Sequence, residues 1–190
     1  MKRCEWVPVG NELYVRYHDE EWGVPVHDDV RLFEMLVLEG AQAGLFWSMI
    51  LKKRENYRAA FDGFDFKKVA LYSEEKVNEL LGNEGIVRNR LKIRSAINNA
   101  KVFIEIRDEL GSFDNYIWGF ARERGFRGQG LGTKGKDWEP PVTNELSDEI
   151  SLDLRKRGMS FVGSTIIYAF MQAVGIVDDH EAGCFRRGKS

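Results

Sequence analysis

The sequence predicts an all-α protein. Apolar residues recur at three- and four-residue spacing through most of the chain, as they do at Leu32, Phe33, Leu36 and Val37. Almost no stretch shows the strict apolar–polar alternation of a half-buried strand. Capping residues and glycines separate the periodic stretches, as expected for the ends of successive helices and the turns between them.

The first third of the chain contains an aromatic-rich start followed by two predicted helices. Residues 1–25 have turn signals at either end and carry four aromatic side chains between them: Trp6, Tyr14, Tyr17 and Trp22. Aromatic residues at this density indicate a lid packed on a core or the wall of a pocket for a flat base. Asp28 and Asp29 cap a first helix. After a turn at Gly44, a second helix is expected over residues 47–57, and residues 61–66 form a turn.

A helix–turn–helix pattern follows in the middle of the chain. Ser73 caps a short helix, residues 81–90 contain Gly82 and Gly85, and a long helix then runs through Ile104. In a helix-hairpin-helix, backbone N–H groups at the start of the second helix face outward and hold a phosphate. Four basic residues surround that point: Arg88, Arg90, Lys92 and Arg94. The alternative is an ordinary connection between two antiparallel helices.

The last third contains a glycine-rich segment between predicted helices. A helix is expected over residues 113–120, and residues 119–144 hold six glycines and five basic residues, a composition typical of a flexible loop. Ser147 is expected to cap a helix that ends near Gly158. Residues 161–174 show strong helical periodicity.

The overall composition is that of an ordinary folded protein. The chain has 190 residues, of which 43% are hydrophobic and 31% charged, and its net charge of -2 gives no global basic field. A local basic patch can nevertheless bind nucleic acid. No apolar run approaches the roughly 20 residues that span a bilayer, and the first residues carry no signal-peptide core. We therefore expect a cytoplasmic protein with no membrane partner.

Chemically informative side chains gather in residues 36–58. Glu39 and Gln42 interrupt an apolar helix, Trp47 follows the Gly44 turn, and a basic run, Lys52-Lys53-Arg54, comes next. A carboxylate, an amide, an indole face and nearby cations suit a flat, positively charged aromatic ligand attached to a polyanion. The alternative is a buried helix end with a satisfied glutamate, a core tryptophan and a solvated basic face.

The two cysteines and two of the three histidines suggest a metal site. Cys4 lies near His18, and His180 lies four residues before Cys184, so one helical turn puts both on the same face. A Cys2His2 set favours tetrahedral zinc, although the spacing is not that of a zinc finger. A disulfide between the chain ends, or two unrelated buried thiols, are the alternatives.

Six blocks of sequence occur in a distinctive order. They are RCEW at 3–6, YHDEEWGVP at 17–25, LFEMLVLEGAQAGLFW at 32–47, LKKRENYRAAF at 51–61, GIVRNR at 85–90, and KRGMSFVGSTIIYAFMQAVGIVDDH at 156–180. Together they closely resemble the family of 3-methyladenine DNA glycosylase I, bacterial enzymes of alkylation repair. The resemblance covers almost the whole chain, and several blocks in order are more specific than any single motif.

The resemblance implies a helix-hairpin-helix DNA glycosylase fold with a zinc site that joins the N- and C-terminal segments. It implies one glycosylase unit over residues 1–190, with a helix-hairpin-helix lobe at about 28–120. A second lobe, from 1–27 and 145–190, would carry the zinc site, and 121–144 would be a flexible loop. The structural Zn²⁺ would be held by Cys4, His18, His180 and Cys184.

The resemblance also implies a base pocket and a DNA contact surface. Glu39 would be the catalytic residue, and the substrate-binding residues would be Trp47, Tyr17, Trp6, Tyr14 and Trp22. DNA would be contacted by Gly44, Leu45, Gly85, Val87 and Arg88, of which Gly44 and Leu45 would enter the gap left by the flipped base. The expected partner is double-stranded DNA containing alkylated bases, bound by a monomer.

The implied reaction is hydrolysis of the N-glycosidic bond of 3-methyladenine, which leaves an abasic site. Setting Gly85-Ile86-Val87 on the hairpin places Asn89 where strand-cleaving relatives have a nucleophilic lysine, so we expect no lyase activity. The superfamily's catalytic aspartate has no clear counterpart. Phe46 replaces a small hydroxyl residue, and the glycine-rich loop also departs from the family. A noncatalytic zinc-stabilised DNA-binding module and a purely structural helical protein are the competing interpretations.

Overall fold

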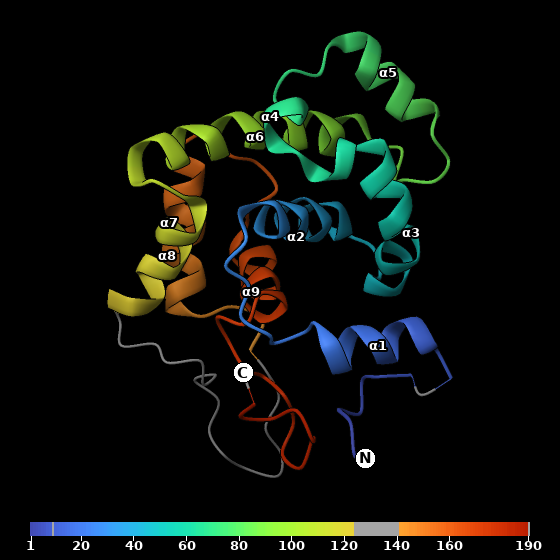
Figure 1. The fold of residues 1–190 in the computed structure, drawn as a ribbon, viewed down its shortest axis with the longest axis vertical. Helices are drawn as coiled ribbons and strands as arrows, with labels where there is room; N and C mark the ends of the chain where they lie inside the picture. The colour runs from blue at the N-terminus through green and yellow to red at the C-terminus, as the bar shows by residue number, and fades with distance from the viewer. Residues whose placement is uncertain (9, 124–140, 190) are drawn as a thin grey trace.

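The computed structural model describes residues 1–8, 10–123 and 141–189, and these ranges contain helices and no strand (Figure 1). The all-α prediction is confirmed. The helical elements are α1 (Glu12–Glu20), α2 (Asp29–Gln42), α3 (Trp47–Ala60), η1 (Asp62–Phe64), α4 (Phe66–Val69), α5 (Glu74–Gly82), α6 (Arg90–Leu110), α7 (Phe113–Glu123), α8 (Glu145–Lys156) and α9 (Ser164–Ala173). No helix in the described ranges is long and apolar enough to cross a membrane.

Helix α2 forms the centre of the core. Its N-cap is Asp28, as predicted, and the Asp28 carboxylate accepts the Arg31 N–H at 2.9 Å. Every residue from Leu32 to Ala41 is buried, so this helix is surrounded on all sides rather than amphipathic. The sequence reads as an apolar helix because α2 has no solvent face over these residues.

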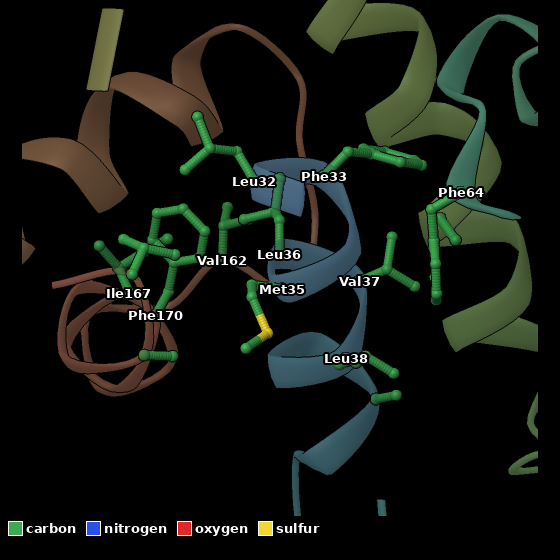
Figure 2. Packing of buried hydrophobic residues seen from close by; sticks show 14 of the residues in the cluster. Leu32, Phe33, Met35, Leu36, Val37, Leu38, Phe64, Val162, Ile167 and Phe170 are labelled. Atoms are coloured by element: carbon green, nitrogen blue, oxygen red, sulfur yellow. The ribbon is translucent and has the colours of Figure 1, made fainter. Parts of the chain in front are cut away.

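Other helices cover α2 from several directions. Helices α3, α6, α7 and α9 all contact it. Figure 2 shows Ile167 and Phe170 of α9 on one side of α2 and Phe64 of η1 on the other. The buried apolar side chains form one cluster that draws on the first 27 residues, the central helices and the C-terminal segment.

Helix α1 was not predicted. Its N-cap is Asn11, whose side chain accepts the Tyr14 N–H at 3.2 Å. The α1 sequence lacks an apolar helical periodicity because its two buried residues are polar. Tyr17 lines a cavity and His18 lies in a cluster with two cysteines, both described below. The start of the chain also meets its end, since the Phe185 N–H donates to the Lys2 carbonyl at 3.0 Å.

Two predicted helix starts were wrong by a few residues. Asn144, not Ser147, is the N-cap of α8, and Ser147 is its capping-box partner three residues later. Helix α9 begins at Ser164 rather than Phe161, because Phe161 has φ +55° and a residue with positive φ lies outside a right-handed helix. Most of the predicted flexible loop, residues 124–140, lies outside the described residues.

Candidate functional site

A cavity of about 250 Å³ opens between helices α1, α2, α3 and α9. Its lining residues are Trp6, Tyr14, Tyr17, Trp22, Glu39, Gln42, Trp47, Ala169 and Gln172. The structure therefore brings the predicted catalytic glutamate and all five predicted base-binding aromatics to one place. Rings on several sides and a carboxylate form a space suited to a flat polar heterocycle.

Glu39 is the unusual group in this cavity. Its side chain is 4% exposed, and its carboxylate accepts no hydrogen bond from the described residues. Burial raises the pKa of Glu39 to about 8. Burial, and then the nearby Glu39 charge, also raises the pKa of Tyr14 and of Tyr17. A buried carboxylate without a partner is expensive in a fold and is characteristic of a ligand site.

Trp47 forms part of the cavity wall next to Tyr17 of α1. It is the first residue of α3, and its ring lies 5.3 Å from that of Tyr17 at an interplanar angle of 49°. The Trp47 Nε1 is buried and has no hydrogen-bond partner among the residues that the structure describes, which is rare for an indole. Both rings and two unpaired polar groups, the Glu39 carboxylate and the Trp47 N–H, therefore border the same cavity.

The other aromatic residues form a layer between this cavity and the chain ends. The Trp6 ring packs edge-on against Tyr14 at 5.7 Å and against Trp22 at 4.9 Å. The same Trp6 ring lies 5.3 Å from His18, and Trp22 lies 4.6 Å from His180. One layer of rings thus lines the cavity on one face and contacts the histidines on the other.

The α2–α3 turn lines a second hollow of about 190 Å³ that shares Glu39, Gln42 and Ala169 with the first. Gly44 and Leu45 line it directly. Gly44 has φ +74°, a conformation in which any other residue would be strained. The predicted wedge residues, Gly44 and Leu45, therefore lie beside the aromatic cavity.

Two pocket residues on α9 were not predicted. Ala169 and Gln172 lie three positions apart and so face the cavity together. The Gln172 side-chain amide donates to the Asp179 carboxylate at 2.8 Å. The available signal was a lone amide in an otherwise apolar helix, but the sequence does not reveal that α9 crosses α2 at this point.

The predicted basic run at the end of this stretch is not one surface. Arg54 is buried, and its guanidinium donates to Glu34 and to Glu21 at 2.7 Å each. The Lys53 ammonium donates to the Glu84 carbonyl at 2.6 Å, and Lys52 is exposed, with no side-chain partner in the part of the chain that the structure describes. The run divides because α3 turns one basic side chain into the core and two away from it.

The segment between α5 and α6, residues 83–89, makes the predicted tight turn. The Gly85 N–H donates to the Asn83 side chain at 2.8 Å, and the Val87 N–H donates to the Tyr57 hydroxyl at 3.1 Å. A Cβ on Gly85 would lie 2.9 Å from the Cβ of Asn56, so glycine is needed there. These two amides stabilise the turn internally.

Three other amides at this turn are free. The N–H groups of Arg88, Arg90 and Leu91 have no hydrogen-bond partner among the described residues. The Arg88 side chain is exposed, with its guanidinium 3.5 Å from the Glu84 carboxylate. Free donors at a helix N-terminus beside an exposed arginine favour an anion.

Three of the four predicted metal ligands lie together. The ligand atoms of Cys4, His18 and Cys184 lie within 4.8 Å of one another, and all three residues are buried. The Cys184 Sγ is 3.4 Å from the His18 Nε2. The His180 ring lies 5.1 Å from the His18 ring but is not one of the three.

The histidines are oriented as metal ligands usually are. The Nδ1 of His18 pairs with Asp19 at 2.8 Å, and that of His180 pairs with Asp178 at 2.7 Å. The His180 Nε2 is buried, and no described residue forms a hydrogen bond with it. Carboxylates at Nδ1 leave both Nε2 atoms for the cluster, which is a common arrangement around zinc. Two thiols and two such imidazoles fit a tetrahedral zinc ion chemically.

A sequence model of a known family covers nearly the whole chain. The family described as methyladenine glycosylase matches residues 6–187. The chain belongs to this methyladenine glycosylase family. DNA-3-methyladenine glycosylase 1 of Escherichia coli (strain K12) is 46% identical over 184 residues, covering 97% of this chain and 96% of that protein.

Solved structures of the family have the same fold. A crystal structure of 3-methyladenine DNA glycosylase I is 46% identical, has a TM-score of 0.91 and covers 98% of this chain and 100% of its own. The Staphylococcus aureus enzyme, described for its recognition of 3-methyladenine, is 29% identical with a TM-score of 0.90 and full coverage of both chains. The family resemblance predicted from the sequence is thus confirmed.

Proposed function

We propose that this protein is a DNA-3-methyladenine glycosylase that flips N3-methylated adenine out of DNA and hydrolyses its N-glycosidic bond. The observation that carries the proposal is the unpaired Glu39 carboxylate in an aromatic cavity of about 250 Å³. Membership of the methyladenine glycosylase family supports the same reaction. A buried base can reach such a cavity only by leaving the duplex stack.

Charge selects the substrate in this proposal. Methylation at N3 gives the adenine of the nucleotide a positive charge, which neutral adenine lacks. With a pKa of about 8, Glu39 is largely protonated in the empty site at neutral pH. A cationic base stabilises the ionised carboxylate and gives that charge a partner. Trp47 and Tyr17 supply ring faces for the same cation. Trp6, Tyr14 and Trp22 complete the wall.

The chemical step needs little acid catalysis. As the glycosidic bond breaks, its electron pair goes to the departing base and neutralises the positive charge there. Water then bonds to the sugar carbon and releases a proton. The protein has to orient the base, admit water and stabilise positive charge on the sugar, for which the Glu39 carboxylate is suitably charged. We assign no water-activating residue.

Strand cleavage is not part of the proposed reaction. Asn89 stands at the position expected for a nucleophilic lysine, and its side chain accepts the Lys92 N–H at 3.1 Å as the N-cap of α6. An amide cannot form a Schiff base with the abasic sugar. The proposed enzyme is therefore monofunctional.

A helix-hairpin-helix formed by α5, residues 83–89 and α6 is the proposed DNA anchor. Gly85 and Val87 shape the hairpin, and Arg88 and the free amides after it contact the phosphate backbone. Gly44 and Leu45 enter the gap left by the flipped base.

A structural zinc ion completes the proposal. Cys4, His18 and Cys184 would hold it, with the Nε2 of His180 as the fourth ligand. When bound, the ion supplies a cross-link between the two chain ends. The cation also favours the thiolate of Cys4, whose pKa burial otherwise raises to about 12.

The wider organisation is also proposed. The glycosylase unit, residues 1–190, would consist of a helix-hairpin-helix lobe at about 28–120 and a zinc-bearing lobe from 1–27 and 145–190. The protein would act as a cytoplasmic monomer on double-stranded DNA.

The deciding experiment is release of free base from methylated DNA, with chromatographic identification of the product. The proposal expects 3-methyladenine to appear while 7-methylguanine stays in the DNA. Salt-dependent DNA binding without base release, by folded protein loaded with zinc, would instead identify a noncatalytic DNA-binding module. Absence of both would leave a purely structural protein.

A further inference from the structure

Lys92, in the first turn of α6, reaches the end of α2. Its ammonium group donates to the carbonyl oxygens of Ala41 and Ala43, both at 2.7 Å. These carbonyls lie 51 and 49 residues away in the sequence, where α2 ends and the chain turns through Gly44. Lysine has three N–H donors and no acceptor, so two of its donors serve this one turn.

Two other carbonyls at the end of α2, those of Gly40 and Gln42, accept hydrogen bonds from the backbone. The Ala43 N–H donates to the Gly40 carbonyl at 3.3 Å, and the Leu45 N–H donates to the Gln42 carbonyl at 2.6 Å. Backbone donors and Lys92 therefore alternate along the end of α2. The last carbonyls of a helix carry partial negative charge and attract a cation. Lys92 supplies that cation from another helix.

The position of Lys92 is unfavourable for its own helix. A positive side chain in the first turn of α6 opposes the helix dipole, which favours acidic residues there. Its neighbours Arg90 and Arg94 pair with Glu74 on α5. The Lys92 ammonium, in contrast, bonds only to carbonyl oxygens among the described residues. The charge of Lys92 therefore stabilises α2 and its turn rather than α6.

The two segments that Lys92 joins have different proposed tasks. Residues 83–89 lead directly into the first turn of α6 and form the proposed phosphate anchor. The other segment carries Glu39 and Gln42 into the base cavity, and Gly44 and Leu45 into the adjoining hollow. A single side chain connects the site of DNA docking to the site of base extrusion.

We propose that Lys92 is a positioning residue that fixes the position of the Gly44–Leu45 turn relative to the hairpin, residues 83–89. When the hairpin binds the DNA backbone, Leu45 then lies at the base stack beside the lesion. This inference rests on the proposed glycosylase function and deepens it. Lys92 touches neither the base cavity nor the proposed phosphate contacts, so its effect passes through the turn.

The test compares Lys92→Met with Lys101→Met. Methionine has a similar length and no donor. Lys101 is an exposed lysine on the same helix whose side chain makes no hydrogen bond to the described residues, so its replacement controls for the loss of one positive charge. Four quantities are measured for each variant: thermal stability, affinity for undamaged DNA, affinity for free 3-methyladenine, and the single-turnover rate of base release.

The expected result is a selective loss. Lys92→Met should release base at least about tenfold more slowly than Lys101→Met, because two charge-assisted hydrogen bonds to the turn are lost. Both variants should bind undamaged DNA equally, and free 3-methyladenine should bind as in the wild type. Equal release rates for the two variants would overturn the inference. A parallel loss of free-base binding would also overturn it, since Lys92 would then only support the pocket.

A double-mutant cycle with Leu45→Ala tests whether Lys92 affects base release through the Gly44–Leu45 turn. If Lys92 acts through the turn, Lys92→Met should have little further effect once Leu45 has been truncated. Additive effects would refute that route. Lys92→Arg, which keeps the charge and the donors, should restore release, and Lys92→Gln replaces the methionine variant if that variant does not fold. Absence of base release by the wild type would refute the glycosylase function itself, a separate outcome.

Discussion

Glu39→Gln should stabilise this protein while reducing its activity. The pKa of Glu39 is raised from 4.5 to about 8 in the folded chain. Below pH 4.5 both states hold the proton and burial costs nothing. As the pH rises further, the unfolded chain loses the proton while the folded chain keeps it, so the free energy of unfolding falls. That loss continues up to about pH 8.

The size of the destabilisation by Glu39 follows from the pH range between its two pKa values, 4.5 in the unfolded chain and about 8 in the folded chain. Each pH unit between the two pKa values costs the folded state about 1.4 kcal/mol, so burial of Glu39 costs roughly 3 kcal/mol at pH 7. Glutamine does not ionise and therefore avoids this cost. Burial of its unpaired amide also costs free energy, so the net stabilisation is smaller than about 3 kcal/mol. Denaturant unfolding at pH 4, 6 and 8 should show a stabilisation of Glu39→Gln that grows with pH.

Glu34→Gln is the matched control. Glu34 lies on the same helix and is 3% exposed, against 4% for Glu39. Burial alone would raise its pKa, but hydrogen bonds and charges from Arg54 and Arg58 outweigh burial and lower it. A lowered pKa contributes stability above the unfolded value, and that stability is lost as the pH falls. Glu34→Gln should therefore destabilise the protein at pH 7, opposite in sign to Glu39→Gln.

The activity assay completes the test. Single-turnover base release should fall at least about a hundredfold in Glu39→Gln, because the charge facing the cationic base and sugar is lost. In Glu34→Gln it should change only with the folded fraction. Glu39→Gln that destabilises the fold at pH 8 and releases base normally would refute the reasoning, since Glu39 would then be a structural residue.

Three further predictions concern the chain ends, the DNA edge and the reaction product. Elemental analysis should find no bound zinc in Cys184→Ser, and its melting temperature should be lower by roughly 5 °C or more. Unchanged zinc content and melting temperature would refute the proposed zinc site. Phe46 is 79% exposed beside the proposed wedge, so Phe46→Ser should weaken binding to abasic DNA several-fold, whereas Leu71→Ser, at an 84% exposed position, should not. Borohydride should trap no protein–DNA adduct, since Asn89 is no nucleophile and the Lys92 ammonium is occupied; an adduct would contradict the monofunctional assignment.

Helices with a dense apolar pattern could be predicted from the sequence, and α1 could not. In α6 the periodicity arises because its buried apolar side chains face neighbouring helices, and α2 has a dense apolar sequence because it is buried on all sides from Leu32 to Ala41. In α1 the two buried residues are Tyr17, at the base cavity, and His18, at the thiol cluster. A helix whose inward side chains serve two polar sites does not have the apolar periodicity that identifies a core helix.

The candidate site was predictable where its residues are close in sequence. Glu39 and Trp47 stand eight positions apart on either side of one turn, and the structure keeps them together. Gln172 was missed because its place in the cavity depends on how α9 crosses α2. Arg54 was misread as part of a basic surface because its partner Glu34 lies on a different helix. In both cases the missing information is tertiary contact.

The two buried carboxylates of α2 explain how one helix supports both the core and the cavity. Glu34 is paired with arginines within the protein, so its charge is satisfied at all times. Glu39 has no such partner among the described residues, and the fold bears the cost of its burial. An arginine near Glu39 would remove that cost, but it would also neutralise the charge that distinguishes a cationic base from a neutral one. The cost of ionising Glu39 is therefore the physical basis of the proposed selectivity, because a positively charged base stabilises the ionised carboxylate and a neutral base does not.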